Sequence, residues 1–387
     1  MIITSLRTAA FRNLADVEIA TSARNVFLVG ENGQGKTNFL EALYFCAYAS
    51  SFRGNGDREI VRDGKKDFSA AIAVEESERP VSSVCISREV LVKVENGKKT
   101  VNIDGKKAED RTEMLSVTPC IVFCHEDMEF TAGSPERRRW FFDQVLSLYD
   151  PVYLDDLRRY RRALKSRNSV LRDNSLHKLN GDLDFLLDAL DPQCALYGTR
   201  LMEKRETAVR LFSEILSPLY EKVSGIAGIT VQYNPSWKER EIDAAEALLR
   251  RRNTDIAAGI SLSGPHRDRY AFIQGSSWRK DGAEFSGKAS TGQRRLLALL
   301  LRVAQARRFF EMTGRNPVLL LDDVLLEMDG EKRRRFLSLL PGYDQAFFTF
   351  LPEEPFQQYR DRDTLVYRIN GGKTQAEGQV QSTECEA

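Results

Sequence analysis

Short apolar runs separated by polar turns fill the first fifty residues of the chain. Alternation predicts β-strands at residues 2–7 and 17–20, and an unbroken apolar run predicts a buried strand at 26–29. After a glycine-rich turn, apolar residues at helical spacing predict a helix from Lys36. Its apolar face carries Phe39, Leu40, Leu43 and Tyr44. The pattern therefore predicts a strand, a loop and a helix in direct succession.

Residues 68–103 are rich in β-forming residues and are interrupted by turn sequences. Strands are predicted at 70–74, 81–87, 90–94 and 100–103. Glu95-Asn96-Gly97-Lys98 and Asp104-Gly105 supply turns between them. This stretch predicts an antiparallel subsheet of hairpins, and a further apolar strand is predicted at 120–123.

The middle of the chain has a helical pattern, and the C-terminal third returns to alternating strands and helices. Apolar positions recur at helical spacing through 136–222, where Asp191-Pro192 and Ser217-Pro218 predict helix breaks or starts. Further strands are predicted at 229–233, 270–273, 318–321, 346–350 and 364–369, and further helices at 238–252, 292–312 and 330–340. Residues 371–387, rich in Gly, Gln, Thr and Ser, predict a flexible tail.

Composition narrows the class of protein. The 387 residues are 42% hydrophobic and 29% charged, which is typical of a globular protein with two or three domains. The net charge of +1 gives no global attraction to nucleic acid or membrane, so such binding would need local patches. Without a signal peptide or a long apolar span, the chain is expected to be cytoplasmic. Cys120 and Cys124 lack a second pair for zinc, which favours buried thiols.

The strongest chemical signal lies in the glycine-rich turn, which fits the phosphate-binding pattern G-x-x-x-x-G-K-[ST] at every defined position. Its residues are Gly30, Glu31, Asn32, Gly33, Gln34, Gly35, Lys36 and Thr37. Backbone N–H groups of such a loop wrap a polyphosphate, the lysine reaches the β- and γ-phosphates, and the hydroxyl binds Mg²⁺. A loop that merely turns a corner is the less favoured alternative. ATP and Mg²⁺ are therefore the predicted cofactors.

A second acidic signal follows the apolar strand predicted at 318–321. Asp322 is positioned to support Mg²⁺ and Asp323 to polarise a water molecule, although acidic loop residues alone would look the same. These carboxylates lie nearly a whole chain away from Lys36. The α/β sheet must therefore be assembled from both ends, with an ATPase head at 1–125 and 262–370 and an inserted, mainly helical lobe at 126–261.

A second possible anion site opens the helix predicted at 292–312. Ser290, Gly292 and Gln293 combine a hydroxyl and a glycine with a helix N-terminus, although an ordinary helix cap has the same form. Two anion sites exceed what one nucleotide needs on one surface. The hypothesis is a homodimer in which these residues cap the γ-phosphate bound by the other copy.

The combined motifs resemble the RecF family, bacterial recombination-mediator ATPases related to the ABC-type heads of SMC proteins. The resemblance covers nearly the whole chain. Its parts are Phe11-Arg12-Asn13-Leu14, residues 30–42, Ser51-Phe52-Arg53 with Asp57, residues 122–139, Ser263-Gly264-Pro265-His266-Arg267-Asp268, residues 290–295 and residues 319–329. The chain departs from the family pattern at Arg269 and Arg294, and at 326–329, where Leu-Glu-Met-Asp replaces Ser-Glu-Leu-Asp.

The resemblance implies an SMC-like head with a short helical lobe, ATP-dependent dimerisation on DNA, and slow ATP hydrolysis. It also implies work with RecR and RecO to load recombinase at single-strand gaps, and support of the SOS response. Lys36, Asp322 and Asp323 are the implied catalytic residues, Thr37 and Asp322 the metal site, and Arg12 and Asn13 further nucleotide contacts. Transporter heads place a histidine after the last core strand, where this chain offers only Thr349.

The DNA surface is predicted from local basic clusters. Its candidates are Arg137, Arg138, Arg139, Arg158, Arg159, Arg161 and Arg162, which could neutralise phosphates without regard to base sequence. The same arginines could instead form a solvated helix face paired with Glu136, Asp155 and Asp156. His266 lacks a partner cluster and is expected to be structural or part of the dimer site.

Two other classes of protein stay open. The ATP-binding subunit of a membrane transporter would share the phosphate loop, but the long helical insertion and the missing histidine weigh against it. A standalone SMC-like ATPase of the overcoming-lesion nuclease type would need metal-binding His and Asp residues beyond the Mg²⁺ site.

Overall fold

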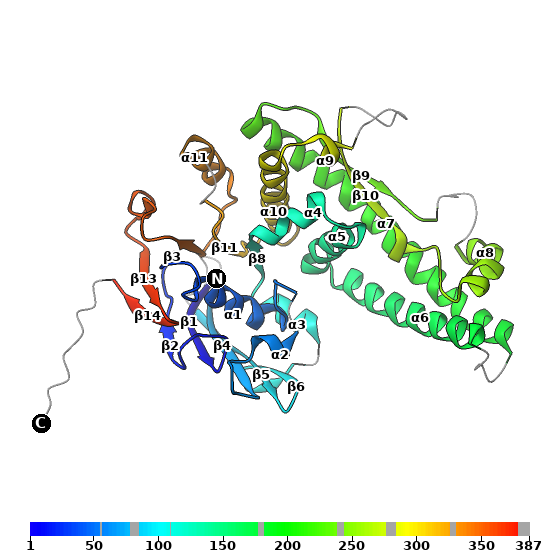
Figure 1. The fold of residues 1–387 in the computed structure, drawn as a ribbon, viewed down its shortest axis with the longest axis horizontal. Coiled ribbons are helices and arrows are strands. Elements are labelled where there is room, and N and C mark those ends of the chain that lie inside the picture. Colours follow the sequence, from blue (N-terminus) through cyan, green and yellow to red (C-terminus); the bar gives the residue numbers. More distant parts are fainter. Residues whose placement is uncertain are drawn as a thin grey trace, which may run out of the picture. The chain divides into compact units, whose positions relative to one another are not determined.

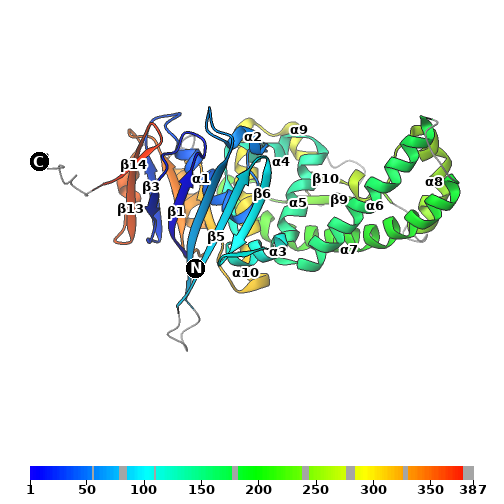
Figure 2. The same ribbon diagram turned by 90° about the horizontal axis from the view of Figure 1, so that it is seen from below.

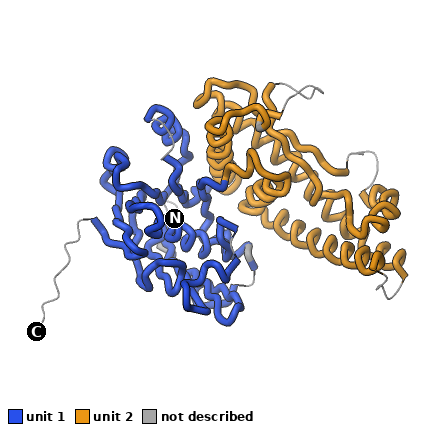
Figure 3. The backbone as a smooth tube through the Cα atoms, viewed as in Figure 1, with its two compact units in different colours: residues 1–126, 314–387 blue, residues 127–313 orange. Residues whose placement is uncertain are grey.

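The computed structural model describes residues 1–54, 56–77, 85–108, 110–176, 182–237, 244–275, 284–325 and 330–377. The chain forms two compact units, shown in blue and orange in Figure 3. Unit 1 joins both ends of the chain, residues 1–126 and 314–387, and unit 2 is residues 127–313. Unit 1 therefore contains residues from both ends of the chain.

Residues 262–313, which the sequence analysis places in the head, pack within unit 2. Strand β10 (Arg269–Gln274) pairs with β9 (Ile229–Asn234). Helix α10 (Thr291–Thr313) packs along α4 (Met128–Ala132), α5 (Pro135–Tyr149) and α7 (Leu183–Ser224) of the same unit.

The central sheet of unit 1 has the strand order β14-β13-β3-β12-β11-β8 (Figure 1). Its strands are β3 (Asn25–Val29), β8 (Cys120–Phe123), β11 (Val318–Leu321), β12 (Ala346–Phe350), β13 (Thr364–Asn370) and β14 (Lys373–Ala376). All neighbours pair in parallel except β13 and β14. Because parallel strands deliver their carboxyl ends to one edge, the loops after β3, β11 and β12 meet there.

A second, antiparallel sheet of unit 1 has the order β2-β1-β4-β5-β6-β7 (Figure 2). Its strands are β1 (Ile2–Ala9), β2 (Glu18–Ala20), β4 (Phe68–Ser77), β5 (Cys85–Glu95), β6 (Lys98–Ile103) and β7 (Lys106–Lys107). The predicted antiparallel subsheet is thus present. The strands predicted at 81–87 and 90–94 are corrected to one strand from Cys85, since Arg88 and Glu89 continue the ladder to β4. Residues 81–84 lie outside the described part.

Helix α1 (Lys36–Tyr48) packs against strands of both sheets. Phe39, Leu40 and Leu43 are fully buried as predicted, but so is the carboxylate of Glu41 on the other face. The predicted one-sided helix is therefore a helix buried on almost every side. Shorter helices complete the unit: α2 (Asp57–Ile60), α3 (Arg111–Val117) and α11 (Gly330–Leu339).

Unit 2 is built on helices. They are α4 (Met128–Ala132), α5 (Pro135–Tyr149), α6 (Pro151–Ser175), α7 (Leu183–Ser224), α8 (Ala244–Ala258), α9 (Phe285–Lys288) and α10. The 42-residue α7 packs along α6 and carries β9 and α8 against its sides (Figure 1). Aromatic side chains dominate the core near β10, where Phe142 stacks on Tyr270 with ring centroids 4.3 Å apart.

The predicted breaks at Pro192 and Pro218 are wrong, because α7 continues through both residues. A proline removes one helical hydrogen bond and costs about 3 kcal/mol in an isolated helix. Buried neighbours offset that cost here. The Asp191 carboxylate, next to Pro192, accepts hydrogen bonds from the buried guanidinium groups of Arg167 and Arg252, and Leu216 and Leu219 flank Pro218 in the core.

The predicted tail from residue 371 starts too early. Gly371 and Gly372 form a tight turn with positive φ, and β14 returns along β13 from Asn370↔Lys373 to Tyr367↔Ala376. The rest of the predicted tail, 378–387, lies outside the described part.

Candidate nucleotide-binding site

The loop at residues 30–37 connects β3 directly to α1. Gly33 and Gly35 have φ of 77° and 118°, in the left-handed region that favours glycine. The Lys36 side chain is buried, and its ammonium Nζ donates to the carbonyl oxygens of Gly30 at 2.6 Å and Glu31 at 3.3 Å. The cation therefore lies within the curve of the loop, where the pattern predicts the phosphates.

The turn between β13 and β14 supports the tip of this loop. The N–H of Gly372 donates to the Gln34 carbonyl at 2.9 Å, and the N–H of Gly371 donates to Gln34 Oε1 at 2.6 Å. A Cβ at residue 372 would lie 1.7 Å from the Asn13 carbonyl oxygen, so only glycine fits there. The sequence pattern places this turn in a flexible tail and gives no sign of its contact with the loop.

The structure brings Thr37 and Asp322 together from opposite ends of the chain. The Thr37 hydroxyl donates to Asp322 Oδ1 at 2.9 Å across a sequence separation of 285 residues. Burial and the adjacent Asp323 carboxylate raise the pKa of Asp322 from its ordinary value of 3.8 to about 7. A carboxyl group such as that of Asp322, which is costly to ionise beside a second carboxylate when no cation is bound, fits a magnesium site.

Asp323 is held by the neighbouring strand β12. Its N–H donates to the Thr349 hydroxyl at 2.7 Å, and that hydroxyl lies 2.9 Å from Asp323 Oδ1. Because β12 separates β3 from β11 in the sheet, Thr349 lies between the phosphate loop and the acidic pair.

Arg12 and Asn13 both lie beside the loop, in different ways. The Arg12 guanidinium makes a two-point contact with the buried Glu41 carboxylate, at 3.0 and 2.9 Å. The Asn13 amide lies 3.4 Å from the carbonyls of Gly33 and Gln34 and accepts a hydrogen bond from Asn38. Their contact with nucleotide stays a prediction. Glu41 was missed, although a charged residue within an apolar helix signals a buried ion pair.

Ser290 and Gln293 form a reciprocal helix cap at the start of α10. The Ser290 N–H donates to Gln293 Oε1 at 2.8 Å, and the Gln293 N–H donates to Ser290 Oγ at 3.2 Å. This is the ordinary cap that the sequence left open as an alternative. Gly292 is exposed, and no atom lies within 4 Å of a Cβ built there, so packing among the described residues does not require glycine.

Most of the predicted DNA-binding arginines have partners within unit 2. The ion pairs are Arg137 with Glu129, Arg138 with Glu284, Arg159 with Asp155, and Arg161 with Asp143. Arg139 donates to the Asp268 carbonyl and Arg158 is half-buried, which leaves Arg162 exposed on α6. Two exposed cations on the same helix, Lys165 and Arg172, were not among the predicted residues.

The motif that contains His266 contributes buried, hydrogen-bonded side chains to the core of unit 2. The Asp268 carboxylate accepts hydrogen bonds from buried Arg205 at 2.8 Å, from the Ser236 N–H and from the Tyr233 hydroxyl. Burial lowers the pKa of His266 to about 4, so the ring is neutral at pH 7. Its Nε2–H donates to the Ser261 carbonyl, and Nδ1 therefore accepts from a tyrosine hydroxyl.

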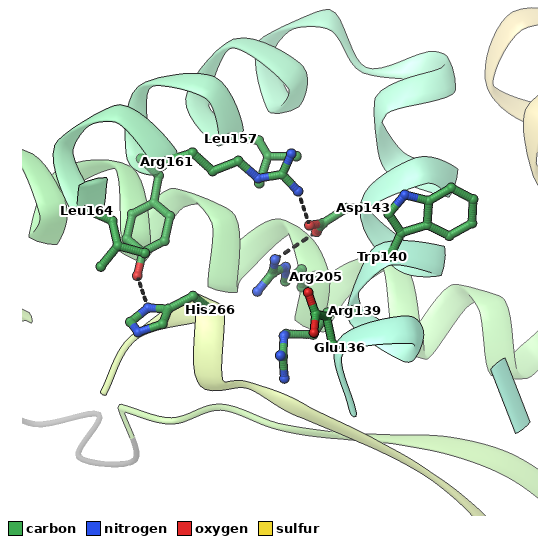
Figure 4. Close-up of a pocket in the computed structure, with 10 residues that line it drawn as sticks. Glu136, Arg139, Trp140, Asp143, Leu157, Arg161, Leu164, Arg205 and His266 are labelled. Atoms are coloured by element: carbon green, nitrogen blue, oxygen red, sulfur yellow. Dashed lines mark hydrogen bonds and ion pairs between the residues drawn. The ribbon is translucent and has the colours of Figure 1, made fainter. Parts of the chain in front are cut away.

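Arg205 and His266 border a cavity of about 200 Å³ in unit 2 (Figure 4). In Figure 4 the Asp143 carboxylate lies between the guanidinium groups of Arg161 and Arg205, to which it is bonded at 3.3 and 2.7 Å. Among the described residues, no group of three or more His, Cys, Asp and Glu side chains could hold a metal ion. Within the same ranges, no helix is long and apolar enough to cross a membrane.

The phosphate loop, the acidic pair after β11, the intervening β12 and the added antiparallel sheet define an ATPase head of the ABC/SMC class. Residues 2–374 match the family described as the RecF/RecN/SMC N-terminal domain. The chain belongs to this family and, within it, to the RecF proteins of DNA replication and repair.

Two relatives show the extent of the similarity. The DNA replication and repair protein RecF of Treponema pallidum (strain Nichols) is 41% identical over 363 residues, covering 94% of this chain and 97% of the relative. RecF of Lachnoclostridium phytofermentans is 30% identical over 378 residues, covering 96% and 99%.

Solved structures agree with this assignment. The recombination mediator protein RecF with ATP, of the RecFOR pathway, superimposes with a TM-score of 0.85 at 26% identity over 97% of each chain. An SMC head domain from Pyrococcus furiosus gives a TM-score of 0.55 at 16% identity, covering 97% of this chain and 96% of the other, and is similar in fold alone.

Proposed function

We propose that this protein is an ATP-dependent DNA-binding protein of recombinational repair that pairs with a second copy when it holds ATP and Mg²⁺. It hydrolyses ATP slowly, assists RecR and RecO in loading recombinase at single-strand gaps, and supports the SOS response. The observation that carries the proposal is the Thr37–Asp322 hydrogen bond, because it joins the phosphate loop to an acidic strand end. The ATP-bound RecF relative supports ATP as the nucleotide.

The residues present fit ATP with Mg²⁺. Lys36 and the N–H groups of residues 30–37 would hold the phosphates, and Thr37 with Asp322 would hold the metal. A bound dication offsets the cost of ionising Asp322 beside Asp323, and it neutralises charge on the phosphates. Asp323 orients the attacking water. Its side chain is one methylene shorter than glutamate, which supports slow turnover through imperfect reach.

The second copy supplies its α10 N-terminus to the bound nucleotide. The Ser290–Gln293 cap is exposed and leaves the backbone around Gly292 open to a partner. Helix N-termini favour anions, which suits contact with the γ-phosphate of the other protomer.

Ser290→Arg is expected to abolish this pairing while it spares nucleotide binding, because the arginine would fill the space needed by the partner. Sedimentation velocity with ATP and Mg²⁺ should show a dimer for the wild type and a monomer for the variant. Asn253→Arg, on the exposed side of α8, adds the same group elsewhere and should still dimerise. A monomeric wild type at micromolar concentration would contradict the sandwiched dimer.

DNA contact is assigned to one basic stripe of α6, made of Arg162, Lys165 and Arg172. The three residues are exposed and lie on one side of the helix by its 100° spacing per residue. They have no ion pair within the described residues, in contrast to four of the seven predicted arginines. Unpaired cations release counterions on binding phosphates and give sequence-independent, salt-sensitive affinity.

Reversing all three charges of this stripe to glutamate is expected to weaken binding to gapped DNA about tenfold or more at moderate salt, and to flatten the salt dependence. Fluorescence anisotropy across a salt series measures both quantities. The matched control reverses Arg210, Lys222 and Arg250, which are also exposed in unit 2, and should retain affinity. Equal losses in the two triple variants would show that overall charge, and not this stripe, determines binding.

A further inference from the structure

The hydroxyl of Thr349 occupies a central place in the nucleotide site. Thr349 belongs to β12 and is only 4% exposed. Its Oγ1 lies 2.7 Å from the Asp323 backbone nitrogen, 2.9 Å from Asp323 Oδ1 and 3.4 Å from Asp322 Oδ1. One buried hydroxyl is therefore within reach of both carboxylates and of the backbone between them.

The donors and acceptors around the Thr349 hydroxyl show that its main partner is Asp323. A threonine hydroxyl has one proton to donate and lone pairs to accept with. The Asp323 N–H can only donate, so it uses a lone pair of Oγ1. Asp322 Oδ1 already accepts from the Thr37 hydroxyl at 2.9 Å, and the shorter contact of Thr349 is to Asp323. Thr349 therefore holds residue 323 by its backbone and its carboxylate together.

The backbone conformation of Asp323 makes its orientation depend on the contacts with Thr349. Its φ of 49° lies in the left-handed region, which is strained for a non-glycine residue and persists only where neighbouring contacts hold it. An aspartate has only two side-chain torsions, so the direction of its carboxylate depends closely on that backbone. Loss of the two Thr349 contacts would leave both the backbone and the carboxylate less well oriented.

We propose that Thr349 is a positioning residue that holds Asp323 in the orientation needed to polarise the attacking water. This inference rests on the proposed ATPase function and deepens it. The hydroxyl acts through the Asp323 carboxylate and not on the nucleotide itself. It should therefore affect the chemical step and leave ATP affinity unchanged.

The test compares Thr349→Val, which removes the hydroxyl at nearly constant volume, with Thr349→Ser, which keeps it. Steady-state hydrolysis and equilibrium binding of a fluorescent ATP analogue are measured for each. We expect kcat to fall about 10- to 100-fold in the valine variant with ATP affinity within about twofold, and the serine variant to recover most of kcat. Thr364→Val, on β13 beside Asp361, is the matched control and should hydrolyse normally.

Three outcomes would overturn the role of Thr349: an unchanged kcat in the valine variant, an equal loss of kcat and ATP affinity, or a serine variant as slow as the valine variant. If Thr349→Val does not fold, Thr349→Cys takes its place, and a kcat equal to that of the wild type would contradict the proposal. A wild type that binds no ATP, or does not hydrolyse it, would refute the proposed function instead.

Discussion

Replacing Asp322 with asparagine is expected to stabilise the nucleotide-free protein at pH 8 and to lower ATP hydrolysis at least about a hundredfold. The folded pKa of about 7 exceeds the ordinary value of 3.8, so this carboxyl favours the folded state only while it is protonated. That contribution is complete below pH 4 and is lost as pH rises through 7. The neutral amide keeps an acceptor for the Thr37 hydroxyl without that penalty, while the metal loses its carboxylate.

The expected gain in the free energy of unfolding is about 2–4 kcal/mol at pH 8 and smaller at pH 5. All three tryptophans lie within 127–313, so their fluorescence reports on unit 2. Hydrogen exchange of peptides across β11, measured in a urea series, reports on unit 1 instead. An equal gain at the two pH values would show that Asp322 does not titrate as described.

Replacing Lys36 with methionine is expected to lower ATP affinity about 10- to 100-fold and to abolish ATP-dependent DNA binding. The ammonium lies inside the loop, 2.6 Å from the Gly30 carbonyl, and charge-assisted hydrogen bonds to phosphate contribute about 1.5–3 kcal/mol each. Methionine retains the length of the side chain but removes the charge. Titration with a fluorescent ATP analogue, followed by DNA binding with ATP, ADP and no nucleotide, measures both effects.

Lys99→Met is the matched control for this prediction. Lys99 is a partly buried lysine of unit 1, and its ammonium also donates to a backbone carbonyl, that of Ala49, at 2.6 Å. Its loss should leave ATP affinity unchanged. If ATP-dependent DNA binding survived in Lys36→Met, the phosphate loop would not be the nucleotide site that controls DNA binding.

The central strands were predictable because burial on both faces of the sheet requires a simple sequence pattern. Strands buried on both faces are continuous apolar runs, so β8, β11 and β12 begin and end where the sequence predicted. The phosphate loop was predictable for a related reason. Its glycines and its lysine are needed at fixed positions, so the pattern can be recognised within eight consecutive residues.

Features that depend on distant partners were not predictable in this way. Pro192 marks a helix break by local rules, yet Asp191 beside it is bonded to Arg167 and Arg252 from two other helices. The turn at Gly371 and Gly372 looks like the start of a tail until Gln34 is placed against it. Local sequence patterns do not predict such contacts, because the contacting residues lie tens to hundreds of positions away.

The predicted DNA-binding arginines also show that the sequence does not reveal distant partners. A basic run in the sequence gives the charge but not its partners, and Arg138, Arg159 and Arg161 are ion-paired in the fold. Lys165 and Arg172 lie outside the consecutive basic run of residues 158–162, and the helix geometry of α6 places them on the same side as Arg162.

The most direct test of the account measures how Mg²⁺ changes ATP affinity in the wild type and in Asp322→Asn. If residues from the two ends of the chain form one site, Mg²⁺ should strengthen ATP binding to the wild type. The variant should bind ATP as the wild type does in EDTA and gain little from Mg²⁺. An equal gain from Mg²⁺ in both proteins would contradict the account, because Asp322 would then lie outside the site that Lys36 and Thr37 form.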